Sequence, residues 1–344
     1  MIKSGMKIAL KRAVTRPLSS CGAFSLTRRL LKGKVVILAY HRVVDDDVNN
    51  YEPGMAVSAD TFTKHMDWLS SRFHVMDLLD YAHGFDKGET PKNPCAIVTF
   101  DDGWLDNYQV AFPIMKSVGV AATIFIASDY FGTGKVYWNS RVEEAVRGID
   151  KRRETLARAF PEEHMPLEAS FLKNSLTDEA PLGAMMSRII AEMKYKSPEA
   201  IEKVAAFLEQ IGEIEVSPKR VVMNWDEVRE MHNAGFKFGS HSASHTIMTT
   251  QNASDCYREA CESMREITAN LGTKPESFAF PNGDHNEVVI REIRRAGYIC
   301  AVTVAPGFAN LSHDLFTLPR FTIHEGGAPS SFHLDYLLSG LAGS

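Results

Sequence analysis

Short, mostly apolar runs recur along the chain, and amphipathic stretches separate them. Runs of four to six such residues, bounded by turn-forming residues, predict buried strands. They lie at residues 35–40, 96–100, 121–126, 236–240, 277–280 and 301–304, with a last candidate at 316–323 that Pro319 interrupts.

Apolar residues spaced three and four apart between these runs predict helices. One helix is expected at residues 61–71, with Asp60 as its N-cap; others should end near Gly119, begin at Asn224, cover 254–271 and end at Gly297. This alternation of strands and helices predicts an α/β fold with a parallel sheet. Residues 129–222 depart from it, because they are rich in helix formers and clustered charges and contain no convincing strand. We expect them to form a mainly helical insertion.

Two polar strings follow predicted strands, where parallel barrels and open α/β sheets place their active sites. Thr99-Phe100-Asp101-Asp102-Gly103 ends one run, and His241-Ser242-Ala243-Ser244-His245 follows another. One Asp and two His suit a divalent metal such as zinc, with a coordination position left for water. A second carboxylate beside them suits a general base. Each string alone also occurs in ordinary turns or helix faces, so the prediction of metal-assisted hydrolysis rests on their joint occurrence.

Composition narrows the classes of function only slightly. The 344-residue chain carries a net charge of −5 and five scattered cysteines. These values give no reason to expect nucleic-acid binding or a disulfide framework. No run of eighteen apolar residues exists, so no transmembrane helix is predicted.

The N-terminus is unlike the rest of the chain. Residues 1–34 hold nine Lys or Arg and no acidic residue, and charges interrupt every apolar stretch that could serve as a signal peptide. We treat them as a basic extension that either precedes the domain in solution or rests peripherally on an anionic membrane surface. The expected location is the cytoplasm, including its membrane face.

Both polar strings, in this order, resemble motifs of the polysaccharide deacetylase family. The similarity extends to Ala39-Tyr40-His41-Arg42-Val43, to the run at 122–126 and to residues 225–239. It implies an irregular (β/α)-barrel of about seven parallel strands over residues 35–344, interrupted by the insertion at about 129–222. It also implies that Asp102, His241 and His245 bind a divalent metal, first of all zinc, with cobalt, nickel and manganese as alternatives. Asp101 would then be the general base.

Two departures from the family pattern leave roles open. Where many members carry an arginine that orients the base, this chain has Ala279. We therefore hypothesise that Arg320 supplies the missing guanidinium beside Asp101. The turn Pro281-Asn282-Gly283 is expected to line the substrate site, with the backbone N–H of Asn282 stabilising the oxyanion.

The general acid and the sugar contacts are less well defined by the sequence. His324, in Phe321-Thr322-Ile323-His324, is the loose match to the family's last motif and ranks first as general acid, ahead of His41. Trp104 is a candidate for stacking on a sugar ring, although a core position explains it equally well.

The predicted function is metal-dependent removal of N-acetyl groups from an amino-sugar-containing glycan or glycan precursor, as in exopolysaccharide biosynthesis. The expected partner is an N-acetylated carbohydrate. Deformylation or ester deacetylation of a sugar would use the same residues. A glycan-binding barrel without activity is a different class, against which the extra carboxylate of Asp101 argues. A metal-dependent phosphoesterase would usually want more carboxylate ligands.

Overall fold

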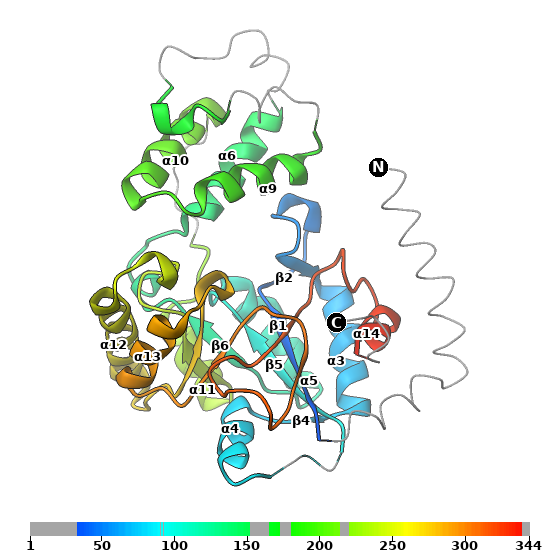
Figure 1. Cartoon of the computed structure of the whole chain (residues 1–344). Helices are drawn as coiled ribbons and strands as arrows, with labels where there is room; N and C mark the ends of the chain where they lie inside the picture. The colour runs from blue at the N-terminus through cyan, green and yellow to red at the C-terminus, as the bar shows by residue number, and fades with distance from the viewer. Residues whose placement is uncertain are drawn as a thin grey trace.

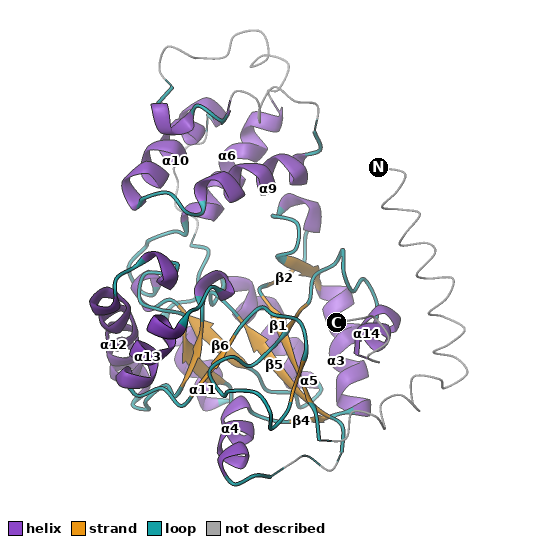
Figure 2. Cartoon of the chain, viewed as in Figure 1, coloured by secondary structure: helices purple, strands orange, loops and turns teal. Residues whose placement is uncertain are grey.

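A nearly closed parallel barrel forms the centre of the molecule. The computed structural model describes residues 33–89, 91, 93–151, 165–172, 180–213 and 220–338. The main sheet has the order β10-β1-β5-β6-β7-β8-β9, and all neighbours except β10 and β1 run parallel. Its strands are β1 Val35–Tyr40, β5 Cys95–Phe100, β6 Thr123–Ile126, β7 Lys237–Ser240, β8 Ser277–Ala279, β9 Cys300–Val302 and β10 Phe308–Ala309. The predicted α/β barrel of about seven strands is confirmed, and Figure 2 shows its strands surrounded by helices.

The C-terminal part of the chain fills the gap between the first and last barrel strands. Leu318 pairs with Val302 of β9, and β11 (Phe321–Thr322) pairs in parallel with Leu38 and Ala39 of β1. The sequence predicted this strand at 316–323. Pro319 shortens it, because proline has no N–H to donate to a neighbouring strand.

Strand composition follows from burial on both faces of the sheet. All six residues of β1 and all six of β5 are buried. Strands covered on both sides read as continuous apolar runs, which is why the sequence located them within one residue. The same argument explains β6, whose four residues are all buried.

Helices pack around the barrel and cap its ends. They are α3 Ala59–Arg72, α4 Leu78–Asp86, α5 Phe112–Ser117, α11 Trp225–Asn233, α12 Ala253–Leu271, α13 Glu287–Ala296 and α14 Ser331–Leu338. The short strands β2 Arg42–Val44 and β3 Ala56–Ser58 precede α3, and β4 His74–Val75 lies between α3 and α4. Asn224 and Glu227 form a capping box at the start of α11. The prediction of Asp60 as N-cap of α3 is wrong: the Ser58 hydroxyl accepts from the N–H of Thr61, and Asp60 lies in the first turn.

The helical segment between β6 and α11 has an apolar core of its own. It contains α6 Trp138–Lys151, α9 Leu182–Met193 and α10 Pro198–Gly212, drawn in green above the barrel in Figure 1. Buried residues of the three helices contact one another, among them Val146, Ile189 and Leu208. Helices α6 and α10 approach closely, since a Cβ at Gly212 would lie 2.7 Å from the carbonyl oxygen of Ala145.

The basic extension lies outside the described residues up to position 32, so its predicted membrane contact stays a prediction. Within the described part of the chain, no helix has both the length and the apolar character needed to span a membrane.

Candidate active site

The turn after β5 brings two adjacent carboxylates to the carboxyl end of the barrel. The N–H of Asp101 donates to the carbonyl of Tyr40 on β1 at 3.0 Å, which continues the strand pairing by one residue. Asp102 and Gly103 then adopt left-handed backbone angles, with φ of 72° and 67°. A Cβ at Gly103 would lie 2.5 Å from the Phe131 ring, so only glycine fits there. Left-handed backbone at a non-glycine residue such as Asp102 concentrates at functional sites.

Asp102, His241 and His245 form a compact cluster of potential metal ligands. The Asp102 Oδ1 atom lies 3.5 Å from His241 Nε2 and 3.0 Å from His245 Nε2, and the three ligand atoms lie within 4.8 Å of one another. His241 Nδ1 is 2.8 Å from the carbonyl oxygen of Ala279. Since a carbonyl only accepts, Nδ1 carries the proton, and the neutral ring presents the lone pair of Nε2 to the cluster. This donor set fits a divalent metal ion.

The charges around the cluster favour a cation there. Burial by itself would raise the pKa of Asp102, but hydrogen bonds with His241 and His245 hold it well below its usual value. Burial would lower the pKa of His241, yet the hydrogen bond to Asp102 and the charges of Asp101 and Asp102 give a net rise. The pocket therefore stabilises positive charge at the position where the three ligand atoms meet.

Arg320 contacts Asp101 in the geometry that the sequence hypothesis requires. Its two terminal nitrogens lie 2.7 Å from the two carboxylate oxygens, and its Nε donates to the carbonyl of Thr303. The side chain is fully buried. Burial would raise the pKa of Asp101, but the charge and hydrogen bonds of Arg320 lower it overall. Arg320 reaches this position because the segment that carries it closes the barrel between β9 and β1, and β1 is the neighbour of β5 in the sheet.

The two histidines considered as general acid lie at different distances from the carboxylates. His41 Nε2 is 3.9 Å from Asp101 Oδ2. The negative charges of Asp101 and Asp102 act to raise the pKa of His41. Burial is the largest effect and lowers the pKa of His41 overall. His324 is half-buried, and burial followed by the charge of His41 lowers its pKa. The geometry thus puts His41 closer to the base than His324, opposite to the ranking from sequence.

Trp104 supports the metal cluster instead of lining a sugar site. Only 2% of the residue is exposed, and its indole N–H donates to Asp102 Oδ2 at 2.9 Å. Arg42 lies against the ring, 4.6 Å from its centroid. This burial contradicts the expectation that Trp104 contacts substrate, because neither ring face is open to a sugar.

Two further residues that the sequence interpretation missed position the same groups. The buried Tyr137 donates to the carbonyl of Asp102 at 2.8 Å, and its ring lies edge-on to His245. Glu259 on α12 accepts from the N–H groups of Ala243 and Ser244, at 3.1 and 2.9 Å, and so holds the loop between the two histidines. No local motif marks Tyr137 or Glu259, since both act across long separations in sequence.

The Pro281–Gly283 turn follows β8, the strand whose Ala279 carbonyl binds His241. Pro281 is buried, and Asn282 is left-handed with φ of 61°. The Asn282 amide donates to Asp284 and to the hydroxyl of Tyr195, a residue of the helical insertion. The turn therefore joins the barrel to the insertion close to the metal cluster.

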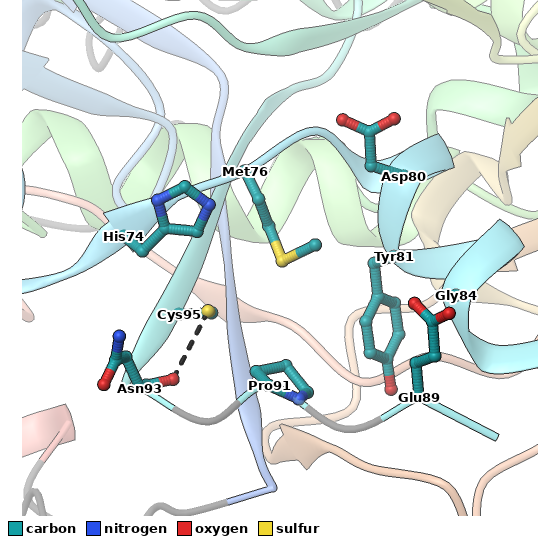
Figure 3. Close-up of a pocket in the computed structure, with 9 residues that line it drawn as sticks. All are labelled: His74, Met76, Asp80, Tyr81, Gly84, Glu89, Pro91, Asn93 and Cys95. Atoms are coloured by element: carbon teal, nitrogen blue, oxygen red, sulfur yellow. Dashed lines mark hydrogen bonds between the residues drawn. The ribbon is translucent and has the colours of Figure 1, made fainter.

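A separate cavity lies at the opposite end of β5. It has a volume of about 230 Å³, and Figure 3 shows Met76, Tyr81, Pro91 and Cys95 among the side chains around it. Cys95 begins β5, whereas Asp101 follows the last residue of that strand. Active sites of parallel barrels occupy the carboxyl ends of the strands, so this cavity is not the catalytic site.

Comparison with known proteins points to one family. Residues 88–158 and 211–301 match the sequence model of the family described as polysaccharide deacetylase. YxkH of Bacillus subtilis (strain 168), whose name provisionally assigns it to the polysaccharide deacetylases, is 20% identical over 300 residues, which cover 87% of this chain and 75% of that protein.

Two solved structures share the fold at low sequence identity. The Streptococcus pyogenes deacetylase PplD, solved in complex with acetate, has a TM-score of 0.57 and 16% identity, covering 86% of this chain and 95% of that one. BC0361, a polysaccharide deacetylase from Bacillus cereus, has a TM-score of 0.55 and 16% identity, covering 90% and 69%. The solved structures share the fold, and the family match assigns this chain to the polysaccharide deacetylases, hydrolases that act on the amide bonds of N-acetyl groups.

Proposed function

We propose that this protein is a metal-dependent deacetylase that removes N-acetyl groups from a glycan, or glycan precursor, of exopolysaccharide biosynthesis. One observation carries the proposal: the Asp102, His241 and His245 cluster lies directly beside a second buried carboxylate that Arg320 holds in place. A binding protein has no use for such a base.

Asp102, His241 and His245 are the residues that would hold the divalent ion, with zinc as the first candidate. Such an ion, when bound, polarises the amide carbonyl and lowers the pKa of water. His241 is prepared for this role because the Ala279 carbonyl fixes its tautomer, and the Trp104 indole fixes the Asp102 carboxylate.

Asp101 acts as the general base in this proposal. Arg320 keeps its carboxylate ionised, since the pKa of Asp101 lies below the usual value. The two hydrogen bonds from Arg320 also fix the direction of both oxygens, which positions Asp101 to take a proton from the attacking water.

The nitrogen of the leaving amine must gain a proton, because expulsion of an amide anion is far uphill. His41 Nε2, 3.9 Å from Asp101 Oδ2, is placed to carry a proton from Asp101 toward that nitrogen. His324 stays the alternative. The backbone N–H of Asn282 is the proposed oxyanion donor, with Pro281 fixing the turn that presents it.

The test is acetate release from N-acetylated oligosaccharides by purified protein of known metal content, with and without a chelator. We expect about one metal per chain, chelator-sensitive acetate release, and loss of release with retained metal in Asp101→Asn. A protein that binds no metal would contradict the assignment of Asp102, His241 and His245.

Formyl and ester substrates use the same residues, so product analysis separates the alternatives. An amine product with acetate supports deacetylation, formate supports deformylation, and a hydroxyl product supports esterase activity. The cytoplasmic location expected from sequence stays a prediction, which fractionation of cells containing the native protein would test.

A further inference from the structure

A large cleft separates the helical insertion from one side of the barrel. Its volume is about 800 Å³. We call it the insertion cleft; it is formed by three segments, namely residues 47–56 between β2 and β3, residues 181–183 at the start of α9, and residues 324–326 after β11. A volume of this size accommodates more than one sugar unit.

Contacts between the insertion and the 47–56 segment fix the shape of the cleft. Glu143 on α6 accepts from the N–H of Glu52 at 2.9 Å, and Arg147 on the same helix donates to the carbonyl of Asn50. A Cβ at Gly183 would lie 2.8 Å from Pro53, so α9 and this segment are in close contact. The cleft is therefore formed before any ligand binds, which lowers the entropic cost of binding.

The cleft adjoins the proposed catalytic residues through His324. His324 lines the cleft and follows β11, which pairs in parallel with β1, the strand that His41 follows; the N–H of Ile323 donates to the carbonyl of Ala39 at 2.8 Å. Glu52 also lines the cleft; burial and the charges of Glu143 and Asp102 outweigh the opposing charge of Lys194 and raise the pKa of Glu52 to about 7. A glycan with one unit at the metal cluster would thus extend into the cleft.

The chemistry of the lining suits an uncharged or amine-bearing carbohydrate. Asn49 and Asn50 offer side-chain amides, and the Tyr51 hydroxyl, which donates to Asp46, keeps lone pairs that accept from sugar hydroxyls. Asp47, Glu52 and Glu325 are acidic, and among the described residues that line the cleft there is no Lys or Arg. Glu325 is already bound to Ser58 and Thr61, and Asp47 accepts from the backbone N–H and the side-chain amide of Asn49. Glu52 is therefore the lining carboxylate that these contacts leave to face a ligand. An ionised Glu52 repels a carboxylate group placed beside it on a ligand, and Lys194, whose charge lowers the pKa of Glu52, acts in the opposite direction.

We propose that the insertion cleft binds the sugar units next to the one being deacetylated, in an extended glycan that lacks anionic groups. This inference rests on the proposed function, because it assigns the neighbouring units of the same substrate. It predicts that the protein recognises a chain and not a single sugar.

The first test measures binding without turnover, so that it is independent of the proposed chemistry. Metal-loaded Asp101→Asn protein is titrated calorimetrically with N-acetylglucosamine and with its β-1,4-linked tetramer. We expect the tetramer to bind at least tenfold more tightly. Asn49→Trp in the same background, which fills the cleft, should lower this ratio about tenfold, whereas Asp67→Trp on the exposed face of α3 should leave it unchanged.

Equal affinity for the two probes, or no binding of either, contradicts the inference even if the wild-type protein releases acetate. Conversely, tight tetramer binding without acetate release by the wild type retains the cleft and rejects the proposed reaction. A ratio that Asn49→Trp and Asp67→Trp lower equally also contradicts the assignment to this cleft.

The second test addresses charge, at pH 8, where Glu52 is ionised. A tetrasaccharide that alternates N-acetylglucosamine with glucuronate should bind about tenfold more weakly than the neutral tetramer. Glu52→Gln keeps the shape and removes the charge, so it should narrow this difference to about threefold. Asp67→Asn, which also removes one carboxylate but at an exposed position of α3, should leave the difference in affinity unchanged. An unchanged difference in Glu52→Gln would remove Glu52 from the proposal.

Discussion

At the scale of single residues, the candidate site depends on how the negative charge of the buried Asp101 carboxylate is balanced by Arg320. Its carboxylate is buried and receives two hydrogen bonds from a fully buried guanidinium. Breaking a buried pair by removing one partner leaves an uncompensated charge, which costs more than the intact pair contributes. Arg320 therefore affects both the ionisation of Asp101 and the stability of the fold, and the two effects need separate measurements.

Substitution of Arg320 should change the pH dependence of catalysis. Arg320 lowers the pKa of Asp101. Its removal in Arg320→Ala therefore raises that pKa, and the acidic limb of kcat/KM should move to higher pH, with kcat lowered about 100-fold. Arg320→Lys keeps a positive charge and should show a smaller movement. Loss of activity with an unmoved acidic limb would mean that Arg320 acts only through folding.

The choice between the two histidines is also a residue-scale question. His41 lies 3.9 Å from Asp101, so His41→Ala should lower kcat about 100-fold or more while metal content stays at the wild-type value. His324→Ala should lower kcat less and raise KM, because His324 lines the insertion cleft. The opposite order would restore the ranking that the sequence suggested.

At the scale of elements, the candidate functional groups follow the ends of strands, and turns with left-handed backbone angles set the direction of their side chains. The turn after β5 holds left-handed Asp102 and Gly103, and the loop after β7 holds left-handed Ser242 and His245. Left-handed backbone at non-glycine residues costs of order 1 kcal/mol or more each, so other contacts must stabilise these turns. For the loop after β7, Glu259 on α12 provides them through two backbone N–H groups and the Ser244 hydroxyl.

Weakening this support should reduce metal affinity without touching a ligand. Glu259→Gln replaces a carboxylate that accepts three hydrogen bonds, so we expect metal affinity to fall about tenfold. Competition with a chelator of known affinity measures this change. Glu262→Gln, a partly buried glutamate on the same helix, is the control and should keep wild-type affinity. Equal affinities in all three proteins would show that Glu259 does not position the loop.

At the scale of the whole molecule, closure of the barrel joins the two ends of the domain at the site. The segment after β9 pairs with both β9 and β1 and carries Arg320 to Asp101, 219 residues earlier in the chain. The insertion lies over the same end and meets the Pro281–Gly283 turn through Tyr195. Global stability and the catalytic charges are therefore linked.

This link predicts how acid affects the metal-free protein. The pKa of Asp101 is lower in the folded state than the unfolded value of about 4. The Asp101–Arg320 pair thus stabilises the fold at pH values above about 4, and this contribution is lost as pH falls through the folded pKa. Denaturant titrations should show the difference in free energy of unfolding between wild type and Arg320→Ala, about 3–5 kcal/mol at pH 6, shrinking below pH 4. A difference that grows in acid would reverse the sign of the assigned shift.

The sequence by itself determined the strands of the barrel and the position of the candidate site. Strands buried on both faces must be apolar throughout, so local composition reveals their positions. The polar residues after Phe100 and Ser240 mark the end of the barrel where the candidate ligand cluster lies. The resemblance to the family also led to Arg320, because this chain has Ala279 where many members carry an arginine, and the structure places Arg320 against Asp101.

Only the tertiary structure decided the remaining roles, because they depend on contacts between residues far apart in the chain. Trp104 reads equally well as a sugar platform or a core residue until its burial against Asp102 and Arg42 is known. The short distance between His41 and Asp101, which favours His41 over His324 as the candidate general acid, arises only because β1 lies beside β5. Glu259 and the insertion cleft have no local signature at all. Local pattern specifies what each strand can be, whereas the packing of strands and helices specifies which side chains meet.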